Sequence, residues 1–135
     1  MTEHKFNWED YFDLGVELMD KYNEESYFRT IISRFYYASF GIIREYLIEN
    51  NIYKNKKSKQ ILNSKSYKVH SEVLNILNDE NTKKSIPEHK QLYSYLYKLR
   101  KIRNISDYEN DIEIDAGCVD YYFVKTKFIF EYFKK

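Results

Sequence analysis

The chain has few of the residues that interrupt regular structure. Among its 135 residues there are three glycines and one proline, and these two residue types mark the tight turns between short strands. The scarcity of these turn-forming residues favours long helices over a sheet of many strands. We therefore predict an all-α fold, with residues 1–135 forming a single bundle of four or five helices.

Cysteine and long apolar runs are also scarce. The single cysteine, Cys118, excludes an internal disulfide framework and fits a reducing compartment. No apolar run approaches the roughly 20 residues that a membrane-spanning helix needs, and the opening MTEHKFNWED does not resemble a signal peptide. These features predict a soluble, cytoplasmic protein that has no membrane partner.

The sequence shows no sign of a metal or a cofactor. Its three histidines, His4, His70 and His89, and its one cysteine lack the spacing of a zinc site. There is also no glycine-rich loop of the kind that cradles phosphate groups. We expect His4 and His89 to be solvated. His70 falls on the apolar stripe of a predicted helix. The first alternative is that it is a core residue, and the second is that it is catalytic.

Charge is balanced overall but unevenly distributed. The net charge of +1 does not by itself indicate a nucleic-acid partner. However, the segment YKNKKSKQILNSKSYK carries six lysines and no acidic residue. We predict a loop here, either simply solvated or in contact with a polyanion through Lys56, Lys57 and Lys59.

The helices are predicted from apolar residues that recur at helical spacing. Asn7 is a candidate N-cap for a first helix that ends near Asn23, and Asp115 is one for the last helix. Between these, helices are predicted from residue 26, over about residues 67–77 and from residue 85, where Ser85 and Glu88 have capping-box spacing. The second helix is apolar on most sides, so it should be central, and Gly41 should allow a close approach to it.

The stretch YKLRKIRNISDYEND places an arginine where an apolar stripe would continue. At 100° per residue, Arg103 falls between Leu96 and Leu99 around the helix. A buried guanidinium needs a partner, because an unpaired buried charge costs several kcal/mol. Either Arg103 pairs with Asp107 and keeps its head group in water, or it faces a cleft or a second subunit and binds phosphate there.

Three segments, in order, resemble a known family. SRFYYASFGIIREYL (residues 33–47), YKVHSEV (67–73) and LRKIRNISDYE (99–109) are similar to the RxYYAxF, KxHSxV and LRxxRxxADY patterns of small bacterial HEPN-domain proteins. The resemblance covers about residues 26–109. It implies a compact helical bundle that forms a homodimer and brings two copies of the motif helix together at a cleft.

The same resemblance implies RNA chemistry. Many HEPN proteins are metal-independent ribonucleases that act as toxins or in antiviral defence, with an arginine followed five positions later by a histidine. Here Arg103 and Asn104 match that pattern, but Tyr108 stands at the histidine position. Tyrosine, with an ordinary pKa near 10, is a poor general base, whereas histidine suits proton transfer near neutral pH.

The roles that follow from the resemblance are these. Arg103 would hold the scissile phosphate, Asn104 would position it and Asp107 would orient Arg103. Tyr108 or His70 would supply the proton chemistry. Arg100 would add to the binding of nucleic acid, and Arg34 would either do the same or pair with Glu45 or Asp107.

Three functions remain open at this point. The first is an RNA-cleaving toxin or defence effector. The second is a non-catalytic module that binds RNA, a nucleotide or a nucleotidyltransferase-like antitoxin. The third is a structural adaptor that docks through its aromatic last helix. We expect RNA or nucleotide binding at a homodimer cleft. Whether the protein is also a ribonuclease stays open because of Tyr108.

Overall fold

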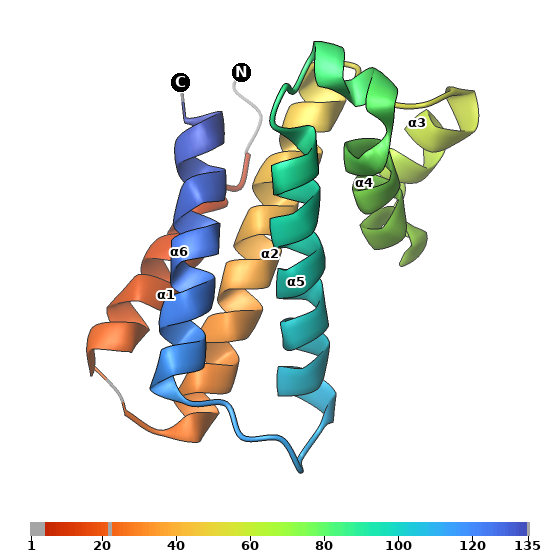
Figure 1. The fold of residues 1–135 in the computed structure, drawn as a ribbon. Helices are drawn as coiled ribbons and strands as arrows, with labels where there is room; N and C mark the ends of the chain where they lie inside the picture. The colour runs from red at the N-terminus through yellow and green to blue at the C-terminus, as the bar shows by residue number, and fades with distance from the viewer. Residues whose placement is uncertain (1–4, 22, 135) are drawn as a thin grey trace.

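The computed structural model describes residues 5–21 and 23–134, and these residues form helices with no strand among them (Figure 1). The all-α prediction is confirmed, although the described residues form six α-helices rather than four or five. In chain order the elements are α1 (Glu9–Lys21), α2 (Glu25–Glu49), α3 (Lys56–Leu62), α4 (Lys68–Asn78), the 3₁₀ helix η1 (Glu80–Lys84), α5 (His89–Tyr108) and α6 (Ala116–Phe133).

Helix α2 is the centre of the bundle, as its apolar surface predicts. It packs against α1, α4, α5 and α6 (Figure 1). Helix α4 lies along α5, and α3 packs on α4 at the edge of the molecule. The largest side chains of α2 that are completely or almost completely buried cover about half of the helix circumference: Ile31, Ile32, Phe35, Tyr36, Ile43 and Leu47.

Gly41 lets another segment approach α2 closely, which confirms the sequence prediction. A Cβ atom added to Gly41 would lie 2.1 Å from a ring atom of Trp8. Trp8 immediately precedes α1, so this residue crosses α2 where the helix has no side chain. Any larger residue at position 41 would have to displace the indole ring.

Two helix starts were predicted correctly and a third was not. The Asn7 side chain accepts a hydrogen bond from the Glu9 amide (3.0 Å), and Asp115 accepts one from the Cys118 amide (2.8 Å). The predicted capping box is wrong, because α5 begins at His89 and its N-cap residue makes no side-chain hydrogen bond. Ser85 instead follows η1, in a turn that buries Ile86 completely.

The lysine-rich segment was predicted to be a loop, and this prediction is wrong. It contains α3, whose N-cap Asn55 accepts a hydrogen bond from the Ser58 amide (2.9 Å). Two inward residues anchor the helix: Leu62 is fully buried, and the Ser58 hydroxyl donates to the buried Glu72 carboxylate (2.6 Å). The many lysines suggested a solvated loop, but two inward residues are enough to hold this short helix in place.

Arg29, near the start of α2, links this helix to the C-terminal end of α5 and to the connection that follows it. Arg29 Nη1 donates to the carbonyl oxygens of Ser106 (2.8 Å) and Glu109 (2.9 Å), and Nη2 donates to that of Ile112 and to the Glu25 carboxylate. The last carbonyls of a helix have no partner within the helix. Arg29 therefore satisfies the end of α5 and holds the connection to α6.

None of the helices in the described part of the chain is both long and apolar enough to cross a membrane.

Candidate functional site

Arg103 is buried between α5 and α2. Its side chain is 10% exposed, and its guanidinium lies over the rings of Tyr36 and Tyr37, at 5.0 and 5.2 Å from the ring centroids. This distance is within the range of cation–π contacts. The interpretation that left the head group in water is therefore wrong.

The predicted pair with Asp107 forms, but it is loose. Arg103 Nη1 lies 3.6 Å from Asp107 Oδ2, which is an ion pair beyond hydrogen-bond distance. Arg103 Nε is buried and has no hydrogen-bond partner among the described residues. The guanidinium thus keeps donor capacity that Asp107 does not use.

His70 reaches the same pair of tyrosines from α4. Its Nδ1 shares a hydrogen bond with the Tyr36 hydroxyl (2.6 Å), and its ring stacks on Phe40 at 4.2 Å and meets Tyr37 edge-on. The structure therefore brings His70 and Arg103, from two different helices, onto Tyr36 and Tyr37. We call these four residues the inner cluster: Tyr36, Tyr37, His70 and Arg103.

The inner cluster carries the positive charge of Arg103 and is largely shielded from solvent at Tyr36 and Arg103. Burial, and then the positive charges of Arg100, Arg103 and Arg44, lower the pKa of His70 to about 4. Burial also raises the pKa of Tyr36 to about 12, against the opposing effect of Arg100 and Arg103. At neutral pH the imidazole and the phenol are therefore both uncharged.

A shallow pocket of about 250 Å³ lies on the adjacent surface. We call it the outer pocket, and it is lined by Leu74, Tyr97, Arg100, Lys101 and Asn104. The ring of Tyr97 is 48% exposed, and Arg100 is fixed by a hydrogen bond to the Ser71 hydroxyl (3.3 Å). Because the charge of Arg100 acts on both Tyr36 and His70, this pocket and the inner cluster are neighbours.

The structure separates the remaining motif residues. Asn104 lines the outer pocket, whereas Asp107 contacts Arg103 of the inner cluster. Tyr108, at the last position of α5, is 74% exposed. The aromatic ring that replaces the expected histidine is thus presented to solvent and is not packed into the inner cluster.

Arg34 lies on the side of α2 that faces α1. Its guanidinium sits over the Tyr11 ring at 5.1 Å, and its buried Nε has no hydrogen-bond partner among the described residues. The predicted ion pairs with Glu45 or Asp107 are wrong, because Glu45 pairs with Lys5 and Asp107 pairs with Arg103. An aromatic ring, rather than a carboxylate, holds this arginine.

The predicted lysines lie outside both parts of the site. Lys56, Lys57 and Lys59 are exposed on α3, and Lys59 lies over the Tyr53 ring at 5.6 Å. Helix α3 packs on α4 and α2, so these lysines border the molecule's edge and do not line the outer pocket.

Of the remaining histidines, His89 was predicted to be solvated, and that is wrong. It is 2% exposed, with Nδ1 2.6 Å from the Leu77 carbonyl oxygen, where it joins α5 to the end of α4. His4 falls outside the described residues. Within residues 5–21 and 23–134, no three histidine, cysteine or acidic side chains are grouped in a way that could hold a metal ion.

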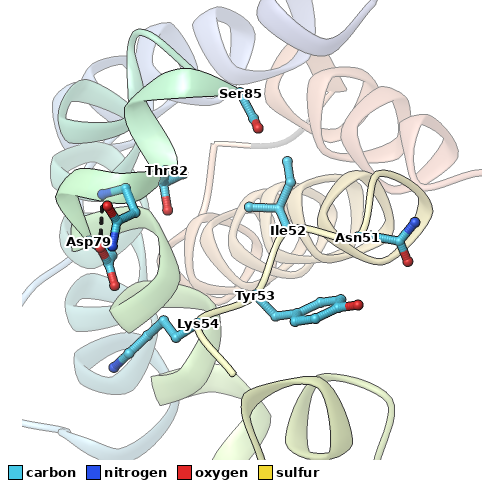
Figure 2. A pocket seen from close by; sticks show the side chains of 8 residues that line it. Asn51, Ile52, Tyr53, Lys54, Asp79, Thr82 and Ser85 are labelled. Carbon is cyan, nitrogen blue, oxygen red and sulfur yellow. Dashed lines mark hydrogen bonds between the residues drawn. The ribbon is translucent and has the colours of Figure 1, made fainter. Parts of the chain in front are cut away.

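A second hollow, of about 180 Å³, lies where the chain leaves α2 and faces η1 (Figure 2). Its polar groups serve local structure: the Asp79 carboxylate accepts from the Asn81 amide (2.9 Å), and the Thr82 hydroxyl donates to the Ile76 carbonyl. Lys54 is its one basic residue. It therefore lacks the group of cations that a phosphate site needs. The residues lining it are Asn51, Ile52, Tyr53, Lys54, Asp79, Asn81, Thr82 and Ser85.

Sequence reasoning did not identify Tyr36, Tyr37, Tyr97 or Lys101 as site residues. The chain holds fifteen tyrosines, so a single tyrosine carries little information. The available signal was the position of Tyr36 and Phe40 one helical turn apart, on the face that meets His70.

Comparison with known proteins gives one relative. Uncharacterized protein MJ0628 of Methanocaldococcus jannaschii is 42% identical over 86 residues, which cover 60% of this chain and 49% of that protein. The chain thus spans about half the length of this relative. No family model and no solved structure matches the chain.

Proposed function

We propose that this protein is a HEPN-like RNA- or nucleotide-binding protein that acts as a homodimer and binds phosphate through Arg103 and Arg100. The observation that supports the proposal most is the state of Arg103: it is buried on two tyrosine rings, its Nε has no partner among the described residues, and its one carboxylate lies at 3.6 Å. Buried charges are normally paired and hydrogen-bonded, so an anion that reached the exposed edge of this guanidinium would complete the site.

The chemistry of arginine favours a phosphate as that anion. A guanidinium is a planar fork of donors that matches the oxygens of a phosphate group. Tyr36 and Tyr37 hold its plane in place, which reduces the entropy lost when a ligand binds. Arg100 and Lys101 add two positive charges on the adjacent surface.

The outer pocket favours a nucleic acid or nucleotide over a simple inorganic anion. The exposed ring of Tyr97 and the side chain of Leu74 offer an apolar surface beside Arg100 and Lys101. A base stacked on an aromatic ring contributes about 1–3 kcal/mol, and nearby cations bind the backbone. This combination suits an unpaired nucleotide.

The test is the binding of a fluorescently labelled hexauridylate, measured by anisotropy. We expect Arg103→Gln to weaken binding at least tenfold, because it removes the charge that meets the phosphate. The matched control is Lys127→Gln, an exposed residue on α6, which should change the affinity by less than twofold. Equal affinities of the two variants, or no binding by the wild-type protein, would contradict the proposal.

Ribonuclease activity is a second candidate, favoured by the placement of His70 on the same tyrosines as Arg103. In that reaction a 2′-hydroxyl attacks the adjacent phosphate and a neutral imidazole takes its proton, while arginine stabilises the developing charge. The bond from phosphorus to the 5′-oxygen breaks, and this oxygen leaves as a hydroxyl after taking a proton from the imidazolium or from water, so that a 2′,3′-cyclic phosphate remains. Cleavage of labelled RNA in the presence of EDTA, lost in His70→Gln but kept in Tyr108→Phe, would support this function.

Binding without cleavage would instead support a non-catalytic module. The partner that the HEPN resemblance implies for such a module is a nucleotidyltransferase-like antitoxin. Co-expression and co-purification with a nucleotidyltransferase-like protein would test that partner. The oligomeric state in solution would test the homodimer.

A further inference from the structure

His70 lies against aromatic rings, and the charged groups that act on it are positive. The charged and titratable groups that act on its ring are Tyr36, Tyr37 and Arg44 from α2 and Arg100 and Arg103 from α5. Helix α3 packs on α4 through Glu72, whose carboxylate is already bound by the Ser58 hydroxyl. The described groups whose charge shifts the pKa of His70 are all arginines, and none is a carboxylate.

We infer that the binding of a phosphodiester to this site is coupled to the uptake of one proton by His70. The inference rests on the proposed function and adds a regulatory property to it. Arg103 lies over the rings of Tyr36 and Tyr37, and the same two tyrosines contact His70. A phosphodiester held by Arg100 and Arg103 would therefore bring a negative charge close to the imidazole. That charge would offset their repulsion of an imidazolium and so favour the protonated ring.

The surroundings of His70 accommodate both protonation states. The Tyr36 hydroxyl lies 2.6 Å from Nδ1, and a hydroxyl both donates and accepts. It can donate to Nδ1 of the neutral ring or accept from Nδ1–H of the charged ring. Phe40, stacked on the imidazole at 4.2 Å, presents an aromatic face that attracts a cation.

The size of the effect follows from the charges. An opposite charge within about 4–6 Å raises the pKa of a base by about 1–3 units, and part of that is lost where the anion is partly solvated. From the value of about 4 in the free protein, a rise of about 1–2 units makes binding roughly twofold to tenfold tighter at pH 5 than at pH 7. A phosphodiester and uracil keep the same charge over that range, so the ligand does not contribute to the change.

The experiment is an NMR titration of the His70 ring protons in the full chain, with and without saturating hexauridylate. The resonance is assigned by its absence in His70→Gln. We expect the pKa of His70 to rise by at least one unit when the oligonucleotide binds. Affinity at pH 5 and pH 7 is measured in parallel for the wild type and for His70→Gln, in which the ratio of the two affinities should be close to one.

The outcomes separate the two proposals. Binding with an unchanged pKa of His70 would overturn the coupling and leave the binding function intact. Absence of binding at both pH values would overturn both. An unchanged pH dependence in His70→Gln would assign the effect to the general charge of the protein at low pH, and would also overturn the coupling. The wild-type titration decides the question even if His70→Gln does not fold, because the ring protons of His70 can also be assigned from their through-space contacts with Phe40.

Discussion

The Tyr36 hydroxyl lies 2.6 Å from His70 Nδ1, and the ring of the same tyrosine lies under the guanidinium of Arg103 at 5.0 Å. One side chain of the central helix thus joins a histidine of α4 to an arginine of α5. Its ring is almost completely buried, so it positions both partners from a fixed point. The phosphate-binding proposal depends on this arrangement.

Tyr36→Phe should destabilise the protein by about 1–2 kcal/mol. The substitution keeps the ring under Arg103 and removes only the hydroxyl, which leaves His70 Nδ1 without its partner. Urea unfolding measures the loss. Tyr108→Phe is the control, since its hydroxyl is on a ring that is 74% exposed, and it should change stability by less than about 0.5 kcal/mol. Equal effects would show that the Tyr36–His70 hydrogen bond adds nothing to stability.

Stability should fall on acidification between about pH 6.5 and pH 4. The folded pKa of His70 is lowered to about 4 from an ordinary value of 6.5, so in this window the unfolded chain binds a proton that the folded protein does not. Stability therefore rises with pH across the window and is fully present above it. The full pKa difference would correspond to a loss of about 3 kcal/mol in the free energy of unfolding. The actual loss should be smaller, because the ring is only half buried and solvent screens its charge.

His70→Gln is the variant that isolates this contribution. Its unfolding free energy should depend less steeply on pH between 4 and 6.5 than that of the wild type, as measured by urea unfolding at several pH values. Carboxylates also titrate at the acidic end, so the difference between the two proteins is the informative quantity. Parallel curves would mean that the pKa of His70 is not lowered by folding.

Gly41→Ala should destabilise the protein by about 1–3 kcal/mol. The added methyl group would overlap the Trp8 ring, and the strain of overpacking should exceed the gain of up to about 1 kcal/mol in helix propensity. Gly117→Ala is the matched control, because its Cβ would meet only Asp115 at 3.5 Å. Thermal unfolding of the two variants compares them directly. A Gly41→Ala variant as stable as Gly117→Ala would refute the close contact with Trp8.

Arg29→Met should cost about 2–4 kcal/mol, because it leaves several carbonyl groups at the end of α5 without their charged donor. Methionine keeps much of the apolar length of the side chain, so the loss reflects the hydrogen bonds. Thr30→Ala, a change at an exposed neighbour, should have little effect. Urea unfolding is again the measurement, and a loss below 1 kcal/mol would rule out a central role for Arg29.

Local signals predicted much of the fold. Asn7 and Asp115 cap helices as their positions indicate, and the apolar residues around α2 predicted its central place. The capping-box prediction failed because Ser85 and Glu88 have the right spacing but the chain between them turns to bury Ile86. Spacing alone does not report that competing burial.

The site was harder to predict than the fold. The position of Arg103 in the apolar stripe indicated that the guanidinium needs a partner, but not that two aromatic rings would supply it. His70 and Arg103 are 33 positions apart, on helices whose relative placement depends on tertiary packing. Tertiary packing also explains the wrong prediction for His89. Its place at the start of a helix suggested a solvated side chain, but the ring is buried and is hydrogen-bonded to the Leu77 carbonyl oxygen.

The long reach of Arg29 has a consequence for how the chain folds. Its backbone partners lie 76 to 83 positions further along the sequence. The carbonyl groups at the end of α5 therefore gain their hydrogen-bond donor only after α2 and α5 have packed together. Amide hydrogens there should exchange with solvent mainly through global opening, not through the fraying that is usual at a helix terminus.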